Sequence, residues 1–218
     1  MNSRVTDQAR APRTYGGQSP DERTARRRRQ ILDAGKQSFG SVGFRASTVR
    51  GICRDAHVAD RYFYELFPTM EDLLVAVYLE CIDTLTDAAA TALSTAPPDA
   101  DTSEFVRRGL DGFFAAVQDR TTARVVWLEV LGVAPQVDST YLATMRKFGD
   151  FMTSYLAQVL PEAADAEFTD RLVTAAVGGL SHTALTWLMD DYRTPRADLV
   201  EGSVRFVVGV LEAARPTR

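Results

Sequence analysis

Apolar residues recur at helical spacing along almost the whole chain, and this pattern decides the class of fold. No segment shows the alternation of apolar and polar residues that a half-buried strand needs. Short stretches rich in Pro, Ala and Asp separate the periodic segments, as at 97–101, 134–138 and 160–165. The sequence therefore predicts an all-α protein of about nine helices.

The chain begins with a polar arm, after which the first helix starts. Residues 1–18 have no periodicity, so we expect a flexible basic arm there. Ser19 and Pro20 predict the start of the helix, because Ser caps a helix N-terminus and Pro suits the first helical position. The apolar stripe of this helix includes Val42, and the helix is expected to end near Gly43.

Two shorter helices follow. One is expected to start at Ser47 or Thr48, and the next to cover about residues 59–67, before Pro68 ends it. A turn at His57 separates the two. Together with the first helix, these segments predict a compact three-helix head.

The third helix divides its side chains by face. At 100° per residue, Phe63, Leu66 and Phe67 cluster on one side, and we expect them to face the core. Arg61 and Tyr64 fall on the opposite side. The sequence therefore predicts that a charged and phenolic surface is available to an outside partner.

The charge of the chain is divided between its two ends. Up to Phe67 there are 13 Lys or Arg against 7 Asp or Glu, which gives +6. The remainder holds 12 basic and 22 acidic residues, which gives −10, and the sum is the net charge of −4. A basic head on an acidic body predicts a polyanion as the partner of the head alone. Two short helices joined by a tight turn suit the major groove of DNA, as a helix-turn-helix.

At this point the sequence also resembles a known family. The run "RRRRQILDAGKQSFGSVGFRASTVRGICRDAHVADRYFYELFPTMEDLLVAVY" is similar to the N-terminal domain of tetracycline-repressor (TetR) family regulators. The positions that carry this resemblance are Ile31, Leu32, Ala34, Phe39, Gly43, Phe44, Ser47, Thr48, Val49, Ile52, Ala56, Val58, Tyr64, Phe67, Pro68, Glu71, Leu73 and Leu74. The resemblance implies a helix-turn-helix DNA-binding domain at 19–68 and a helical ligand-binding and dimerisation domain at 69–218.

The resemblance also implies roles for particular residues. Thr48 and Tyr64 match positions that commonly bind phosphates, and Asp60, Arg61 and Tyr62 match the base-reading surface. The full set of candidate DNA-binding residues is Ser47, Thr48, Arg50, Asp60, Arg61, Tyr62, Tyr64 and Thr69. We also expect one of the four arginines at 26–29 to lie near a phosphate, and the arm at 1–18 is either untethered or in transient contact with DNA.

Two positions depart from the family pattern. His57 stands in the turn where the family usually has Gly, and we expect it to adopt a positive φ there. Met70 stands where the family often has Lys, so one phosphate contact is expected to pass to Arg50 or to the arm.

The resemblance also implies that the body holds a small-molecule inducer. Aromatic and sulfur-containing residues gather in its middle, and they are typical either of plain core or of a pocket lining. The candidate pocket residues are Phe113, Trp127, Glu129, Phe148, Met152, Thr183, Thr186 and Trp187.

The last two helices are the candidate dimer interface. Residues 172–189 are nearly all apolar, with Gly178 and Gly179 in the middle, where a neighbouring helix could approach closely. The last helix adds an apolar stripe, formed by Val204, Val207, Val208 and Leu211. These residues predict a homodimer with a four-helix interface, and the alternative is that both helices are ordinary intrachain core.

Other function classes find little support. The two cysteines have no metal-ligand spacing, and we find no glycine-rich phosphate loop and no nucleophile elbow, so no catalytic residue, metal or cofactor is expected. No apolar run long enough to span a bilayer and no signal peptide are recognised, which predicts a cytoplasmic protein. We expect a transcriptional repressor that a ligand releases from its operator. The alternatives are a helical enzyme or lipid-like carrier, and an architectural DNA-binding protein without a ligand.

Overall fold

The structure is a computed structural model that describes residues 19–159 and 166–214. The expected arm at 1–18 lies outside these residues. The described part is built of α-helices, one short 3-10 turn and loops, so the prediction of an all-α fold is confirmed. The helices are α1 (Pro20–Ser41), α2 (Val49–Asp55), α3 (Asp60–Leu66), α4 (Met70–Ser94), α5 (Thr102–Val117), α6 (Arg120–Leu128), α7 (Pro135–Val159), α8 (Ala166–Met189) and α9 (Arg196–Ala213).

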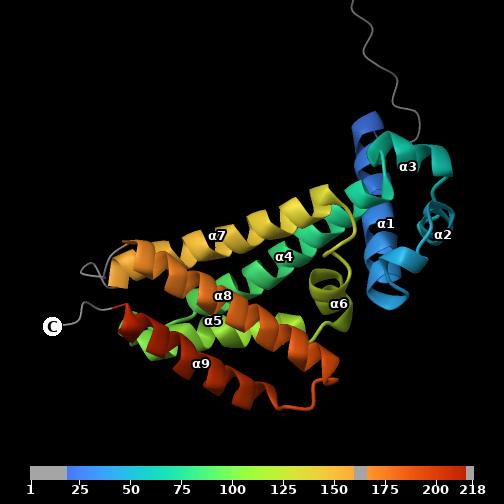
Figure 1. Ribbon diagram of the computed structural model, residues 1–218. Helices are drawn as coiled ribbons and strands as arrows, with labels where there is room; N and C mark the ends of the chain where they lie inside the picture. The colour runs from blue at the N-terminus through green and yellow to red at the C-terminus, as the bar shows by residue number, and fades with distance from the viewer. Residues whose placement is uncertain (1–18, 160–165, 215–218) are drawn as a thin grey trace, which may run out of the picture.

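The helices form a head and a body. The helices α1, α2 and α3 make the head, and α4 runs from the head into a bundle that contains α5 to α9 (Figure 1). Short α6 lies where the body meets α1. One continuous hydrophobic core extends from Phe39 and Phe63 in the head to Phe114 and Leu211 in the body, so the two parts are packed together.

Local sequence signals determine the helix ends. Ser19 and Glu22 form a capping box at the start of α1, and Thr69 and Asp72 form another at the start of α4. Val42 follows the end of α1 and is 62% exposed, so the expectation that it belongs to the core stripe is wrong. Gly43, with φ 91°, turns the chain directly after it.

The expectation that no apolar run is long enough to span a bilayer is wrong for helix α8. Residues 167–189 are long and apolar enough to cross a membrane, judged by length and composition alone. In this fold the helix packs between α7 and α9 and also contacts α6. Its apolar composition therefore has a use within a packed helical body.

Candidate DNA-binding surface and ligand cavity

Helices α2 and α3 are held in a fixed relation by buried side chains and a tight turn. Ile52 and Cys53 of α2 and Phe63 of α3 are buried in the head core. His57 has φ 54°, and the Val58 N–H donates to the Cys53 carbonyl at 3.0 Å. The predicted turn conformation of His57 is therefore confirmed, and this geometry is that of a helix-turn-helix.

The two faces of α3 differ as the helical spacing predicts. Phe63 and Phe67 are 0% and 3% exposed, whereas Tyr64 is 60% exposed and Arg61 is also exposed. The phenol of Tyr64 meets the edge of the Phe63 ring, with ring centroids 5.4 Å apart, and this contact supports the orientation of Tyr64. The prediction of a charged and phenolic outer face is confirmed.

Tyr62 organises the arginines beside it. The Arg27 guanidinium lies over the Tyr62 ring, 3.8 Å from its centroid, and Arg61 donates a 2.7 Å hydrogen bond to the Tyr62 hydroxyl. Tyr62 itself is only partly exposed. The arrangement therefore holds two guanidinium groups at one edge of α3.

Arg50, Asp60 and Thr48 lie beside this edge. The Arg50 side chain is 92% exposed, and its guanidinium lies 4.0 Å from the Asp60 carboxylate. Thr48 caps α2 by accepting the Gly51 N–H at 3.1 Å, and its hydroxyl proton stays available to another acceptor.

Two of the candidate DNA-binding residues instead direct their donors inward. The Ser47 hydroxyl lies 2.7 Å from the Ser38 hydroxyl and donates to the Gly43 carbonyl, and its N–H donates to the Phe44 carbonyl. Thr69 donates both its N–H and its hydroxyl to the Asp72 carboxylate. The donors of both side chains are thus used within the fold, and a phosphate contact from either one stays a prediction.

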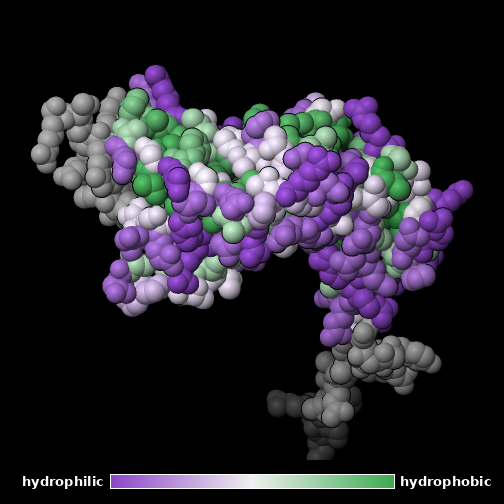
Figure 2. Space-filling view, turned by 90° about the horizontal axis from the view of Figure 1, so that it is seen from below, coloured by the Kyte–Doolittle hydropathy of each residue, from purple (hydrophilic) through white to green (hydrophobic). Residues whose placement is uncertain are grey.

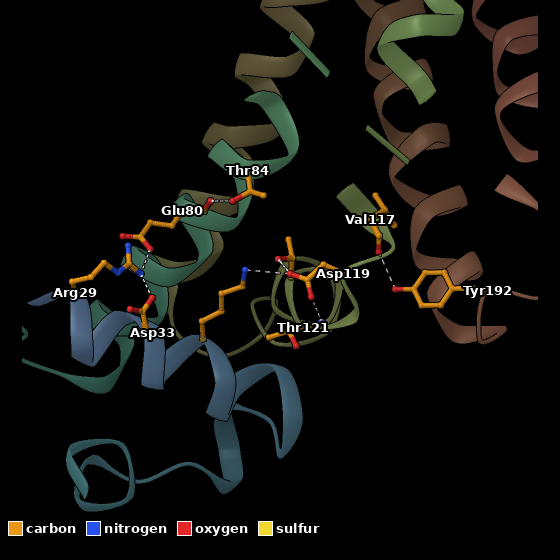
Figure 3. A network of polar contacts seen from close by, with 10 residues as sticks. Arg29, Asp33, Glu80, Thr84, Val117, Asp119, Thr121 and Tyr192 are labelled. Carbon is orange, nitrogen blue, oxygen red and sulfur yellow. Dashed lines mark hydrogen bonds and ion pairs between the residues drawn. The ribbon is translucent and has the colours of Figure 1, made fainter. Parts of the chain in front are cut away.

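The four arginines at 26–29 have different surroundings. Arg28 lies over the Phe67 ring at 5.1 Å, and Arg29 pairs with Asp33 at 2.7 Å and with Glu80 at 2.8 Å (Figure 3). The hydrogen bond that Arg29 donates to the Glu80 carboxylate raises the pKa of Arg29 above its ordinary value. Arg29 is thus engaged with the body, whereas exposed Arg26 has no ion pair among the described residues.

A cavity of about 490 Å³, partly open to solvent, lies in the body. Residues from α4 to α9 line it, and most of them are apolar. The polar lining residues are Asp83, Thr86, Thr144, Lys147 and Ser181. An apolar pocket with few polar groups is typical of a site for a largely apolar ligand.

Four of the eight predicted pocket residues line this cavity, namely Phe113, Trp127, Phe148 and Met152. The other four do not, and those expectations are corrected. Trp187 is buried against Phe114 and donates its indole N–H to the Thr194 carbonyl. Thr183 and Thr186 donate their hydroxyls to carbonyls one turn earlier in α8. Glu129 points to the head, where it accepts the Phe44 N–H.

The sequence reasoning missed much of the cavity wall. Aliphatic residues of α4 and α5 form a large part of it, including Leu79, Ile82, Val106 and Leu110. Aromatic and sulfur-containing residues predict only part of the wall, because aliphatic residues at helical spacing do not distinguish a cavity lining from packed core. The apolar face of α4 is wide, because it packs on α5 and also lines the cavity. This width is a signal that could have indicated the aliphatic lining residues.

The head is joined to the body by polar contacts. Lys36 of α1 pairs with Asp119 at 3.3 Å (Figure 3). Burial acts to raise the pKa of Asp119, but hydrogen bonds from Thr122 and Lys36 outweigh it and lower this pKa. On the body side, the Tyr192 hydroxyl donates to the Val117 carbonyl at 2.9 Å. The start of α6 is therefore fixed against α1, and the end of α5 is fixed against the turn after α8.

Comparisons with known proteins agree with this geometry. The sequence profile of the bacterial regulatory proteins of the tetR family matches residues 31–77. The HTH-type transcriptional activator FasR of Mycolicibacterium smegmatis is 24% identical over 209 residues, which cover 94% of this chain and 93% of FasR.

Solved structures show the same fold over nearly all of the chain. FadR from Bacillus subtilis, in complex with stearoyl-CoA, has a TM-score of 0.68 at 19% identity, covering 83% of this chain and 97% of FadR. FadR from Bacillus halodurans, a fatty acid degradation regulator, has a TM-score of 0.66 at 20% identity, covering 86% and 99%. A tetR-family regulator from Streptomyces coelicolor has a TM-score of 0.69 at 17% identity, covering 87% and 82%. With a helix-turn-helix head whose sequence matches the tetR profile and a helical body of the same fold, the chain belongs to the TetR family of bacterial transcriptional regulators.

Proposed function

We propose that this regulator binds an operator as a homodimer and leaves it when a ligand with a long apolar chain enters the body. The observation that carries this proposal is that an exposed, partly pre-oriented α3 face and a separate apolar cavity of about 490 Å³ lie in one continuously packed chain. Residues 19–68 then act as the DNA-binding domain and residues 69–218 as the ligand-binding and dimerisation domain, in the cytoplasm.

The proposed DNA contacts divide into two kinds. Tyr64, Thr48 and Arg50 are exposed and bind phosphates, which position the head on the duplex. Arg61 reads a base edge in the major groove, with its guanidinium oriented by Tyr62. Asp60 limits the reach of Arg50 through the 4.0 Å ion pair.

The proposed dimer interface is the outer surface of α8 and α9. Phe168, Met189 and Phe206 are 47%, 68% and 43% exposed, and a Cβ added at Gly178 or Gly202 would meet no atom within 4 Å. Of the predicted stripe of α9, Val204, Val207 and Leu211 are buried within the chain and Val208 is half-buried, so the proposed interface uses the outer side chains instead. Figure 2 shows hydrophobic surface on the body, including its end away from the head, while the head surface is largely hydrophilic in that view. Exposed apolar surface of this kind supports a second copy of this chain as the partner.

The proposed ligand is a long-chain acyl-CoA. The relative FadR is described in complex with stearoyl-CoA. In this chain the cavity supports an alkyl chain, since apolar side chains from six helices line it. Exposed Lys147 is the one cationic residue among the lining residues, and it suits an anionic head group at the rim. The cavity argues against an architectural protein without a ligand, which would need a solidly packed body.

Binding-site selection from random duplexes, followed by fluorescence anisotropy with and without stearoyl-CoA, tests the proposal. We expect Arg61→Ala to lower discrimination between the selected site and a mismatched one by roughly 1–3 kcal/mol. Tyr64→Phe should weaken binding to all duplexes by a similar factor, because a phosphate contact carries no base information. An operator affinity that does not change between 50 and 200 mM salt would contradict phosphate-dependent binding.

A further inference from the structure

We propose that Glu129 is a positioning residue that transmits occupation of the cavity to the helix-turn-helix. This inference rests on the proposed function. The relevant contacts, here named the Glu129 junction, are those of the Glu129 carboxylate with the Phe44 N–H and with the Arg124 guanidinium.

Both carboxylate oxygens of Glu129 have a hydrogen-bond partner in this junction. One carboxylate oxygen accepts the Phe44 N–H at 2.7 Å, and the other accepts from Arg124 at 3.1 Å. The Glu129 side chain is 12% exposed, so solvent screens these bonds less than it screens a surface pair. Gly43 allows the close approach, since a Cβ there would lie 3.0 Å from the carboxylate.

Phe44 leads directly into the DNA-binding helices. It starts the 3-10 turn Phe44–Ala46, which joins α1 to α2. Its carbonyl accepts the N–H of Ser47, the residue before the α2 cap, and its ring packs on Phe39 with centroids 5.5 Å apart. A displacement of the Phe44 backbone therefore moves the start of α2.

The end of α6 also borders the cavity. Trp127 lines the cavity, and its indole N–H donates to the Ser181 hydroxyl at 2.9 Å. Glu129 directly follows α6, two residues after Trp127, and its carboxylate bonds Phe44 of the head. One of them meets the ligand site and the other meets the head.

The two ends of α6 are held by different contacts. At its start, Thr121 packs closely on Gly40 of α1. A Cβ added at Gly40 would lie 2.9 Å from the Thr121 backbone. At its end, α6 stops at Leu128, and Gly132 with φ 75° turns the chain toward α7. A ligand that displaces Trp127 is thus expected to move the end of α6, with Glu129 on it, about its fixed start.

The test compares operator affinity without ligand and with saturating stearoyl-CoA, and the ratio of the two dissociation constants is the coupling factor. We expect Glu129→Leu to lower the coupling factor at least tenfold, and Arg124→Met to lower it less. Glu129→Gln should keep most of it, because the amide oxygen still accepts the Phe44 N–H. Stearoyl-CoA affinity without DNA should stay within about threefold of wild type in each variant.

Glu104→Leu is the matched control, since it removes a carboxylate that pairs with Arg108 inside α5. We expect it to leave the coupling factor unchanged. If Glu129→Leu fails to fold, Arg124→Met and Glu129→Gln still separate the two halves of the junction. If neither Glu129→Leu nor Arg124→Met lowered the coupling factor below the wild-type value, the inference would be overturned and the proposed function would stand. A coupling factor of one in the wild type would overturn the proposed function with it.

Discussion

Substituting Gly40 by Ala tests whether contact between α1 and α6 holds the head on the body. A Cβ at this position would lie 2.4 Å from the Thr121 methyl carbon and 2.9 Å from both the Cα and the carbonyl oxygen of Thr121. Real Cβ atoms essentially never approach another heavy atom closer than 3.0 Å. Because two of the three close atoms are backbone, a change of side-chain rotamer cannot relieve the contact, and the two helices must separate.

The expected cost follows from two opposing effects. Overpacking costs about 1–3 kcal/mol, and a backbone clash belongs at the upper end of that range. Replacing Gly by Ala inside a helix returns about 1 kcal/mol through helix propensity. The free energy of unfolding should therefore fall by about 2 kcal/mol, which corresponds to a fall in Tm of about 4–8 °C for a chain of this length.

Urea unfolding followed by circular dichroism, at one fixed protein concentration, measures the change. Gly149→Ala is the matched control in α7, because its Cβ would meet only Val173, at an ordinary distance of 3.7 Å. We expect this control to be slightly stabilised, by up to about 1 kcal/mol. A Gly40→Ala protein as stable as the control would show that α1 and α6 are not closely packed in solution, and would refute the reasoning.

Two other expectations follow from which side chains are exposed and which are buried. Phe206→Glu should convert the dimer to a monomer and abolish operator binding without lowering helicity, because the side chain is 43% exposed in the single chain; light scattering after size-exclusion chromatography checks this. Burial raises the pKa of Cys53 and of Cys81 from 9.0 to about 11, and that of Tyr78 from 10.0 to about 12. Folding thus favours the neutral forms, so their contribution to stability is complete below pH 9 and is lost as the pH rises toward 11 and 12, which alkaline unfolding curves would measure.

The head could be predicted from sequence because its determinants are local. Caps, turn residues and helical spacing act within a few positions, and they correctly assigned Phe63, Tyr64 and His57. The end of α1 was less accurate, because Val42 continues the apolar spacing although the helix has already stopped. Spacing alone does not report where the backbone turns.

The cavity and its surroundings could not be predicted in this way, because they depend on contacts between residues far apart in the sequence. Glu129 accepts the Phe44 N–H across 85 positions of sequence, and the aromatic residues near it in the sequence predict a ligand contact instead. Trp187 looked like a pocket residue, but its indole bonds the turn after α8. The stripe of α9, with Val204 and Val207, could equally serve the core or a dimer, and the packing of α5 on α9 decides for the core.

The energy that a ligand can supply limits which ligands act. Moving a conformational balance from 1:99 to 99:1 requires about 5.5 kcal/mol of differential affinity. Burial of an alkyl chain gives about 0.8 kcal/mol per methylene, so about seven methylenes are needed even if all are buried in one state only. The exposed ion pairs that join head and body, such as Arg29 with Glu80, each resist by no more than about 1 kcal/mol.

Chain length should therefore separate binding from release. We expect butyryl-CoA at saturating concentration to leave the operator complex largely intact, and stearoyl-CoA to dissociate it. Anisotropy titrations with acyl-CoA molecules of increasing length would locate the transition, and a parallel series of direct ligand titrations would establish saturation for each. If saturating butyryl-CoA released the operator as completely as stearoyl-CoA, burial of the alkyl chain would not be the source of the switching energy, and contacts at the rim, such as those of Lys147, would have to supply it.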